Sequence, residues 1–197
     1  LRFQRFRSVD QVPPAILEVA LEMTAVAEKL VNARVCFVRH AVAHVTADSL
    51  SVLGGTTFHG GCLGTHCAGA RELVCFLLTI GSTLDDRVHE LSDRKDLLEA
   101  LFLDTAGWLA IERTFRSFRA SLAARLRREG FRLTPRLGPG YLDWPLTEQV
   151  EFFSLFDGVR APVTLTEHCV MVPKHSLSGL FGLIHDSGVS GSPTRSG

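Results

Sequence analysis

Apolar residues recur at helical spacing in four stretches of the chain, and this spacing predicts four helices. The predicted helices cover residues 13–33, 83–91, 96–129 and 146–156. The first opens on a pair of prolines, which are favoured at helix starts. The longest is expected to stop at Gly130, because glycine commonly follows a helix C-terminus.

Stretches rich in β-branched residues lie between the helices and predict strands. Segment 34–53 is rich in valine and predicts one or two strands divided at Ala47-Asp48, and the apolar run 74–81 predicts a buried interior strand. Between them, segment 54–69 holds six glycines and is expected to form a flexible loop. Shorter strands are predicted over 162–166, 169–172 and 177–184.

Length and composition indicate one globular domain. The chain has 197 residues, of which 46% are hydrophobic, so it can bury a sizeable core. Helices and strands alternate along it, which indicates a single mixed α/β domain over residues 1–186. Segment 187–197 is rich in serine, glycine and proline and is expected to be a disordered tail.

The chain carries 21 basic and 21 acidic residues, so its charge gives no reason to expect nucleic acid or an anionic membrane as a partner. Its longest apolar runs fall well short of the roughly 20 residues that cross a bilayer. Five cysteines, an odd and scattered set, fit reduced thiols better than a disulfide framework. No apolar signal-peptide core is present. We therefore expect a cytoplasmic protein with no membrane partner.

The densest candidate for binding chemistry is segment 134–145, Thr-Pro-Arg-Leu-Gly-Pro-Gly-Tyr-Leu-Asp-Trp-Pro. Its prolines fix φ, and its glycines allow the backbone to approach a ligand closely. Arg136 offers a planar fork for a carboxylate or phosphate, and Tyr141 offers a ring face and a hydroxyl. The same composition is typical of a connector between two helices. The sequence pattern therefore leaves both a binding loop and a connector open.

Two acids of the predicted helix 96–129 need partners. At about 100° per residue, Asp104 and Glu112 fall inside an arc of apolar residues that includes Leu101 and Trp108. A carboxylate taken out of water without a partner is costly, so each acid is expected to meet a cation, hydrogen-bond donors or a polar ligand. The alternatives are an internal pair with arginine, a position at the flank of the helix, and a ligand-facing role.

Two groups of residues contain the side-chain types that bind metals. The first lies in the glycine-rich segment and consists of His59, Cys62, His66 and Cys67. Its side chains suit zinc, but its spacing matches no standard pair of chelating motifs and ordering so many glycines is costly, so a mobile loop is preferred. The second is His40 and His44 with Asp48, which a strand with partly exposed histidines explains better. No metal site is predicted from either group.

Two motifs in the second half of the chain carry a family resemblance, whereas the common nucleotide and serine-hydrolase motifs are absent. Segment 136–145 and segment 165–179, Leu-Thr-Glu-His-Cys-Val-Met-Val-Pro-Lys-His-Ser-Leu-Ser-Gly, resemble the S-adenosylmethionine-binding activation domain of cobalamin-dependent methionine synthase, in a free-standing form. Segment 79–81 and the helix with the two acids extend the resemblance over residues 72–184. It implies an α+β fold, an antiparallel sheet with flanking helices.

The resemblance also implies site residues. In that family, an arginine and a tyrosine of the first motif hold S-adenosylmethionine together with nearby backbone. The positions that take this role by resemblance are Arg136, Gly138, Gly140 and Tyr141. Further candidates for facing the ligand or the corrin are Asp104, Glu112, Asp143, Glu167, Ser176 and Ser178. No catalytic side chain is implied.

The implied reaction is reductive methylation. Cob(II)alamin takes one electron from a flavodoxin-like or ferredoxin-like donor, and the resulting cob(I)alamin attacks the sulfonium methyl of S-adenosylmethionine to give methylcobalamin. The chain would be an accessory component of a cobalamin-dependent methyltransferase system, in which it positions two cofactors. It lacks the Asp-x-His-x-x-Gly signature of a cobalamin-binding module. The cobalamin is therefore expected on a partner, a corrinoid protein or split methionine synthase.

Two departures from the family pattern leave alternatives open. Residues 1–70 match poorly and contain no clear counterpart of the aspartate that contacts the amino group of the ligand. Segment 142–145, Leu-Asp-Trp-Pro, replaces the Pro-Ala-Cys-Pro type continuation of full methionine synthases. The first alternative is a corrinoid-protein partner or chaperone without methyl-donor binding. The second is a metal-binding regulatory protein that uses the glycine-rich segment.

Overall fold

The computed structural model describes residues 12–186, and four of its helices lie where apolar spacing predicts them. They are α1 (Pro14–Leu30), α3 (Thr83–Asp93), α4 (Leu97–Arg128) and α5 (Gln149–Ser154), which the short 3-10 helix η2 (Leu146–Glu148) precedes. Gly130 follows the end of α4 with a φ of 81°, which confirms the expected glycine stop. None of the helices in this range is long and apolar enough to cross a membrane. The predicted disordered tail, 187–197, lies outside the described residues.

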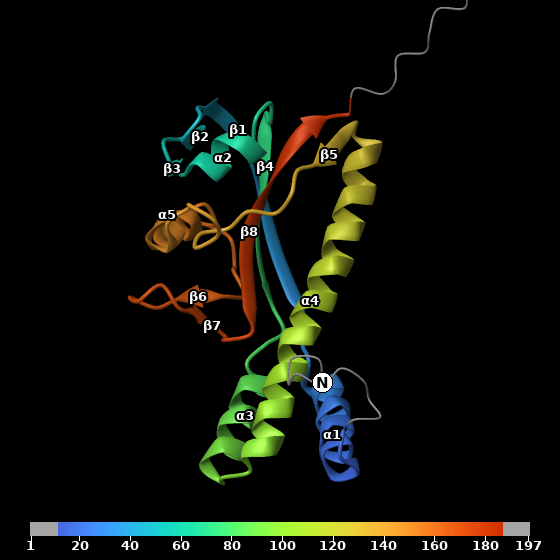
Figure 1. Cartoon of the computed structure of the whole chain (residues 1–197). Helices are drawn as coiled ribbons and strands as arrows, with labels where there is room; N and C mark the ends of the chain where they lie inside the picture. Colours follow the sequence, from blue (N-terminus) through green and yellow to red (C-terminus); the bar gives the residue numbers. More distant parts are fainter. Residues whose placement is uncertain (1–11, 187–197) are drawn as a thin grey trace, which may run out of the picture. The chain divides into compact units, whose positions relative to one another are not determined.

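Six strands form one antiparallel sheet in this part of the chain, in the order β3-β2-β1-β4-β8-β5. They are β1 (Arg34–Val45), β2 (Ser49–Val52), β3 (Thr57–His59), β4 (Glu72–Thr79), β5 (Phe131–Leu133) and β8 (Ser176–His185). A separate ribbon pairs β6 (Thr164–Leu165) with β7 (Met171–Val172), as Figure 1 shows. The predicted class, α+β with an antiparallel sheet and flanking helices, is confirmed. Among the strands of this sheet, the sequence pattern did not predict β3 and β5, because three residues are too few to show an alternation.

The central strands account for the most apolar run of the sequence. β4 is buried at every position after Glu72, and β8 is buried along most of its length. The interior strand predicted from the run 74–81 is therefore confirmed. The expected division of segment 34–53 at Ala47-Asp48 is also confirmed, because β1 ends before this pair and β2 begins after it.

Contacts within the chain group it into two compact units. Among the described residues, unit 1 holds 12–37, 76–118 and 149–178, and unit 2 holds 38–75, 119–148 and 179–186. Strands β1, β4 and β8 and helix α4 contribute residues to both units. A single domain over residues 1–186 stays a prediction. Each unit is described by itself below.

The glycine-rich segment 54–69 forms regular structure, so the expectation of a flexible loop is wrong. It contains β3 and the helix α2 (Gly61–His66), in which Cys62 is buried. A side-chain carbon on Gly64 would lie 2.3 Å from the carbonyl oxygen of Thr46. Gly64 therefore lets α2 pack directly against the turn between β1 and β2. Here glycine serves close backbone packing rather than flexibility.

The buried face of α4 in unit 1 differs from the expected apolar arc. Leu103 is fully buried, whereas Leu101 and Trp108 are 50% and 43% exposed. Glu112 is exposed too, and it accepts a hydrogen bond from Arg116 Nε one turn later at 2.9 Å. The expected placement of Glu112 on the core face is therefore wrong, whereas the alternative of a pair with arginine is confirmed. The expected arc is confirmed only in part, because its members Ile111, Leu122 and Leu126 are buried while Leu101 and Trp108 are exposed.

Candidate functional site

Segment 134–145 belongs to unit 2 and contains a turn closed by its own backbone. The Gly140 N–H donates to the Trp144 carbonyl at 2.9 Å, and the Trp144 N–H donates to the Tyr141 carbonyl at 3.0 Å. The Tyr141 N–H donates to the Gly138 carbonyl, also at 3.0 Å. Gly140 has a φ of 84°, in the left-handed region that glycine adopts without strain. These residues therefore hold one another in a fixed conformation.

Trp144 anchors the end of this turn in the core of unit 2. Its ring is 1% exposed and lies edge-on to Phe58 of β3, with the ring centroids 5.3 Å apart. Its indole N–H donates to Glu148 Oε2 at 2.9 Å, so the polar atom of the buried ring is satisfied. Before the turn, Leu137 exchanges two backbone hydrogen bonds with Leu180 of β8, at 3.1 and 2.8 Å. The turn is therefore attached to unit 2 at both ends, by Leu137 and by Trp144.

Arg136 and Tyr141 form a stacked pair on this turn. The guanidinium carbon of Arg136 lies 4.5 Å from the centroid of the Tyr141 ring. Arg136 is half-buried, and Tyr141 is 51% exposed. A guanidinium over an aromatic ring makes a favourable cation–π contact, and its planar group of N–H donors matches the geometry of a carboxylate. With Gly138 and Gly140 in the same turn, all four residues expected to hold S-adenosylmethionine lie together in unit 2. Their binding role stays a prediction.

Asp143, a candidate for facing the ligand, binds the start of α2. Its carboxylate accepts hydrogen bonds from the Gly61 N–H at 2.7 Å and the Cys62 N–H at 3.0 Å. A hydrogen bond from the Cys62 thiol, together with these backbone donors, lowers the pKa of Asp143 below its usual value. In turn, burial and the hydrogen bond to Asp143 raise the pKa of the Cys62 thiol to about 11. Asp143 therefore connects the turn to α2 as an anion.

We expect Asp143→Ala to be less stable than the wild type at neutral pH, because the start of α2 loses both acceptors. The pKa of Asp143 is lowered in the folded state, so its stabilising contribution is present above the unfolded value and is lost as the pH falls through the folded value. The difference in free energy of unfolding, measured with urea, should therefore shrink as the pH falls below about 4.

The exposed Asp157 provides the control for this experiment, as Asp157→Ala. This variant should unfold like the wild type throughout the titration. A stability difference for Asp143→Ala that stayed constant from neutral pH down to about pH 3 would contradict a role for the ionised carboxylate.

Unit 1 contains a separate polar cluster around His175, just before β8. The ring of His175 is fully buried, with Nδ1 bonded to the carboxylate of Asp85 and Nε2 3.1 Å from the backbone carbonyl oxygen of Asp104. The Asp104 carboxylate pairs with the Lys174 ammonium, and the side chain of Asp104 is 26% exposed. The expectation that Asp104 meets a cation is therefore confirmed.

Sequence reasoning missed His175, although Gly107 gave a signal for it. Glycine in the middle of a helix is unfavourable by about 1 kcal/mol relative to alanine and calls for a packing reason. A side-chain carbon on Gly107 would lie 2.5 Å from Nε2 of His175, so the buried ring is that reason. Both ring nitrogens lie within hydrogen-bond distance of oxygen atoms, Nδ1 of the Asp85 carboxylate and Nε2 of the Asp104 carbonyl.

The remaining candidates also belong to unit 1 and differ in exposure. Glu167 has a side chain that is 85% exposed, next to His168. Ser176 and Ser178 are buried, and the Ser176 hydroxyl donates to the Pro173 carbonyl at 2.6 Å. The candidates thus fall into two sets, the turn with Asp143 in unit 2 and the acids and serines in unit 1.

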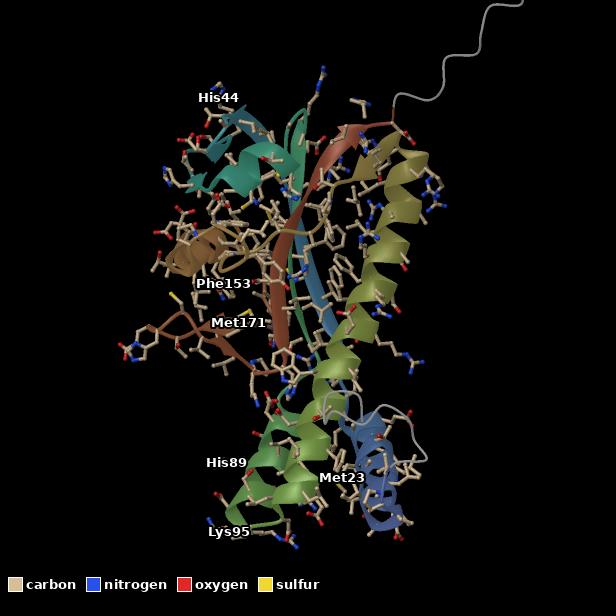
Figure 2. All side chains as sticks on the ribbon, in the orientation of Figure 1. Met23, His44, His89, Lys95, Phe153 and Met171 are labelled. Carbon is tan, nitrogen blue, oxygen red and sulfur yellow. The ribbon has the colours of Figure 1, made fainter. Side chains whose placement is uncertain are left out.

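Within residues 12–186, no three histidine, cysteine, aspartate or glutamate side chains come together as a metal site. His59 Nδ1 bonds Glu148 Oε1 at 2.9 Å, and His66 Nδ1 donates to a backbone carbonyl one turn earlier at 2.8 Å. Burial raises the pKa of the Cys67 thiol to about 12. His44, labelled in Figure 2, is exposed near the end of β1. The reading as a metal-binding regulator therefore has no support in this range.

Comparisons with known proteins bear on the fold. Neither protein-family models nor curated protein sequences match this chain. Among solved structures, the crystal structure of the MetH reactivation domain bound to AdoHcy is similar, with a TM-score of 0.60 and 19% sequence identity. The similarity covers 88% of this chain and 66% of that chain, so this chain spans just under two thirds of the neighbour. The two proteins share a fold.

Proposed function

We propose that the turn from Arg136 to Tyr141 binds S-adenosylmethionine, and that the chain supports reductive methylation of cobalamin held by a partner protein. The observation that carries the proposal is the stack of Arg136 on Tyr141, because it presents a guanidinium and an aromatic ring on a turn attached at both ends. The fold neighbour supports the proposal, since its structure contains AdoHcy, the product that remains when S-adenosylmethionine loses its methyl group.

The side chains of the turn match the chemistry of the ligand. S-adenosylmethionine carries a carboxylate and an ammonium at one end, a flat adenine at the other and a sulfonium between them. Arg136 would take the carboxylate through two N–H groups, and Tyr141 would offer its ring or hydroxyl to the adenosine part. Asp143 would act indirectly, because its carboxylate already accepts hydrogen bonds from the start of α2 and so orients the turn.

The chain's own contribution would be to bind and orient the methyl donor. Cobalamin, after one-electron reduction by a flavodoxin-like or ferredoxin-like protein, supplies the cobalt that accepts the methyl group, and S-adenosylhomocysteine leaves. Correct positioning of two reactants can itself account for much of the rate acceleration. We propose no side chain of this protein as acid, base or nucleophile. The cobalamin would arrive on a corrinoid protein or a split methionine synthase.

Reconstitution tests the complete proposal. The purified chain is mixed with a corrinoid protein carrying cob(II)alamin, reduced flavodoxin and methyl-labelled S-adenosylmethionine, and methylcobalamin is followed by its absorption spectrum and its label. We expect one S-adenosylhomocysteine for each methyl group transferred. A chain that bound the corrinoid protein but neither bound S-adenosylmethionine nor formed methylcobalamin would overturn the proposal in favour of a chaperone role.

A further inference from the structure

Unit 1 contains a groove of about 530 Å³ lined by α1, at the lower right of Figure 1, and by part of the long helix α4. Its walls are mainly small or apolar side chains, with Ala27 on α1, Val31 just after the end of α1, and Ala106, Leu109 and Ala110 on α4. Leu109 is 51% exposed. On both helices the lining residues recur every three or four positions, so the groove follows the helix axes, a shape that accommodates another helix.

Two unpaired charges of opposite sign line the same groove. They are Glu28 on α1 and Arg113 on α4, both exposed. Neither side chain forms an ion pair or hydrogen bond with another described residue. They are the two charged residues among those that line the groove, one from each helix.

We infer that this groove is the interface of a symmetric dimer, in which α1 and α4 of one copy pack against α4 and α1 of a second copy. A two-fold interface uses the same surface on both partners and must be complementary to itself. The groove meets this requirement, because Glu28 of each copy can pair with Arg113 of the other. The apolar walls supply a core and the charged pairs a rim, the usual construction of a protein interface.

A second copy accounts for the groove better than a small molecule does. A small ligand would leave much of an elongated, apolar groove in water and would need both charges close to one point. The helices of a second copy cover the length of the groove and bring an arginine to Glu28 and a glutamate to Arg113. This inference is independent of methyl-donor binding, because its residues belong to unit 1 and the Arg136 turn belongs to unit 2.

Charge-swap variants of the full chain test the dimer by analytical ultracentrifugation over a range of concentrations. The wild type is expected to sediment as a dimer, with twice the 21.6 kDa mass of one chain. Either substitution alone, Glu28→Arg or Arg113→Glu, places like charges opposite one another at both contacts of the dimer. Each should therefore raise the dissociation constant of the dimer by roughly tenfold or more. Glu22→Arg, on the same helix but not lining the groove, is the matched control and should stay dimeric.

A mixture of the two single variants gives the decisive test of the dimer. A heterodimer of Glu28→Arg with Arg113→Glu restores opposite charges at both contacts, so the mixture should recover the dimer that each variant lacks. This recovery also rules out misfolding of either variant, which circular dichroism checks separately. A wild type that stayed monomeric, or a mixture that failed to associate, would overturn the inference. Binding of an apolar anion such as anilinonaphthalene sulfonate to a monomeric groove would assign it to a small ligand instead.

Discussion

Replacing Arg136 with alanine is expected to weaken S-adenosylmethionine binding by about 1.5–3 kcal/mol, which is roughly a 10- to 150-fold rise in Kd. The size of the effect follows from the loss of charge-assisted hydrogen bonds to the carboxylate of the ligand. Tyr141 would also lose the guanidinium that lies 4.5 Å from its ring centroid. Isothermal titration calorimetry of the folded variant measures the change directly.

Two further variants separate the role of Arg136 from a general effect of charge. Arg132→Ala removes an exposed arginine of β5, four positions earlier, and should leave the affinity unchanged. Arg136→Lys keeps the charge but loses the planar fork, so its affinity should lie between those of the wild type and Arg136→Ala. Equal affinities for Arg136→Ala and Arg132→Ala would contradict a carboxylate clamp at Arg136.

Replacing Trp144 with alanine is expected to lower the free energy of unfolding by about 3–5 kcal/mol. The indole is almost fully buried against Phe58, and its removal would leave a cavity between the turn and β3. Glu148 would also lose its hydrogen bond from the indole N–H. Urea unfolding followed by circular dichroism measures the loss, and ligand affinity should fall as well because the turn is no longer anchored.

The same turn offers a matched control for Trp144→Ala. Leu142 is 73% exposed, so Leu142→Ala should change stability by no more than about 0.5 kcal/mol. Trp144→Phe keeps an aromatic ring but loses the N–H donor, and should fall between these two variants. A loss of less than about 1 kcal/mol for Trp144→Ala would show that the turn does not depend on this anchor.

The regular elements were predictable because local periodicity determines them. The long helix, the interior strand and the glycine stop at residue 130 each follow from a pattern within one segment. Segment 54–69 was misread because six glycines are typical of a loop, while one of them, Gly64, permits close contact between α2 and the β1–β2 turn. Such a contact joins parts of the chain that no local pattern connects.

The site was predictable only in part, for the same reason. The turn with Arg136 and Tyr141 is contiguous, so its composition alone marked it as a candidate. The partner of Asp143 is 81 residues earlier in the chain, and Asp104 meets a lysine 70 residues later. Glu112 was placed on the wrong face because α4 contributes to both units and carries apolar residues on several sides. Spacing along one helix does not show which side faces a core.

The proposed function depends most on whether the chain binds S-adenosylmethionine. Equilibrium dialysis of the folded protein against the labelled compound measures this without an electron donor, a corrinoid or a partner. We predict saturable binding of one molecule per chain that S-adenosylhomocysteine displaces and that Arg136→Ala weakens. At about millimolar ligand, even a binding free energy of about −4 kcal/mol would be detected. Folded wild-type protein that retained no label at this concentration would contradict binding of S-adenosylmethionine by this chain.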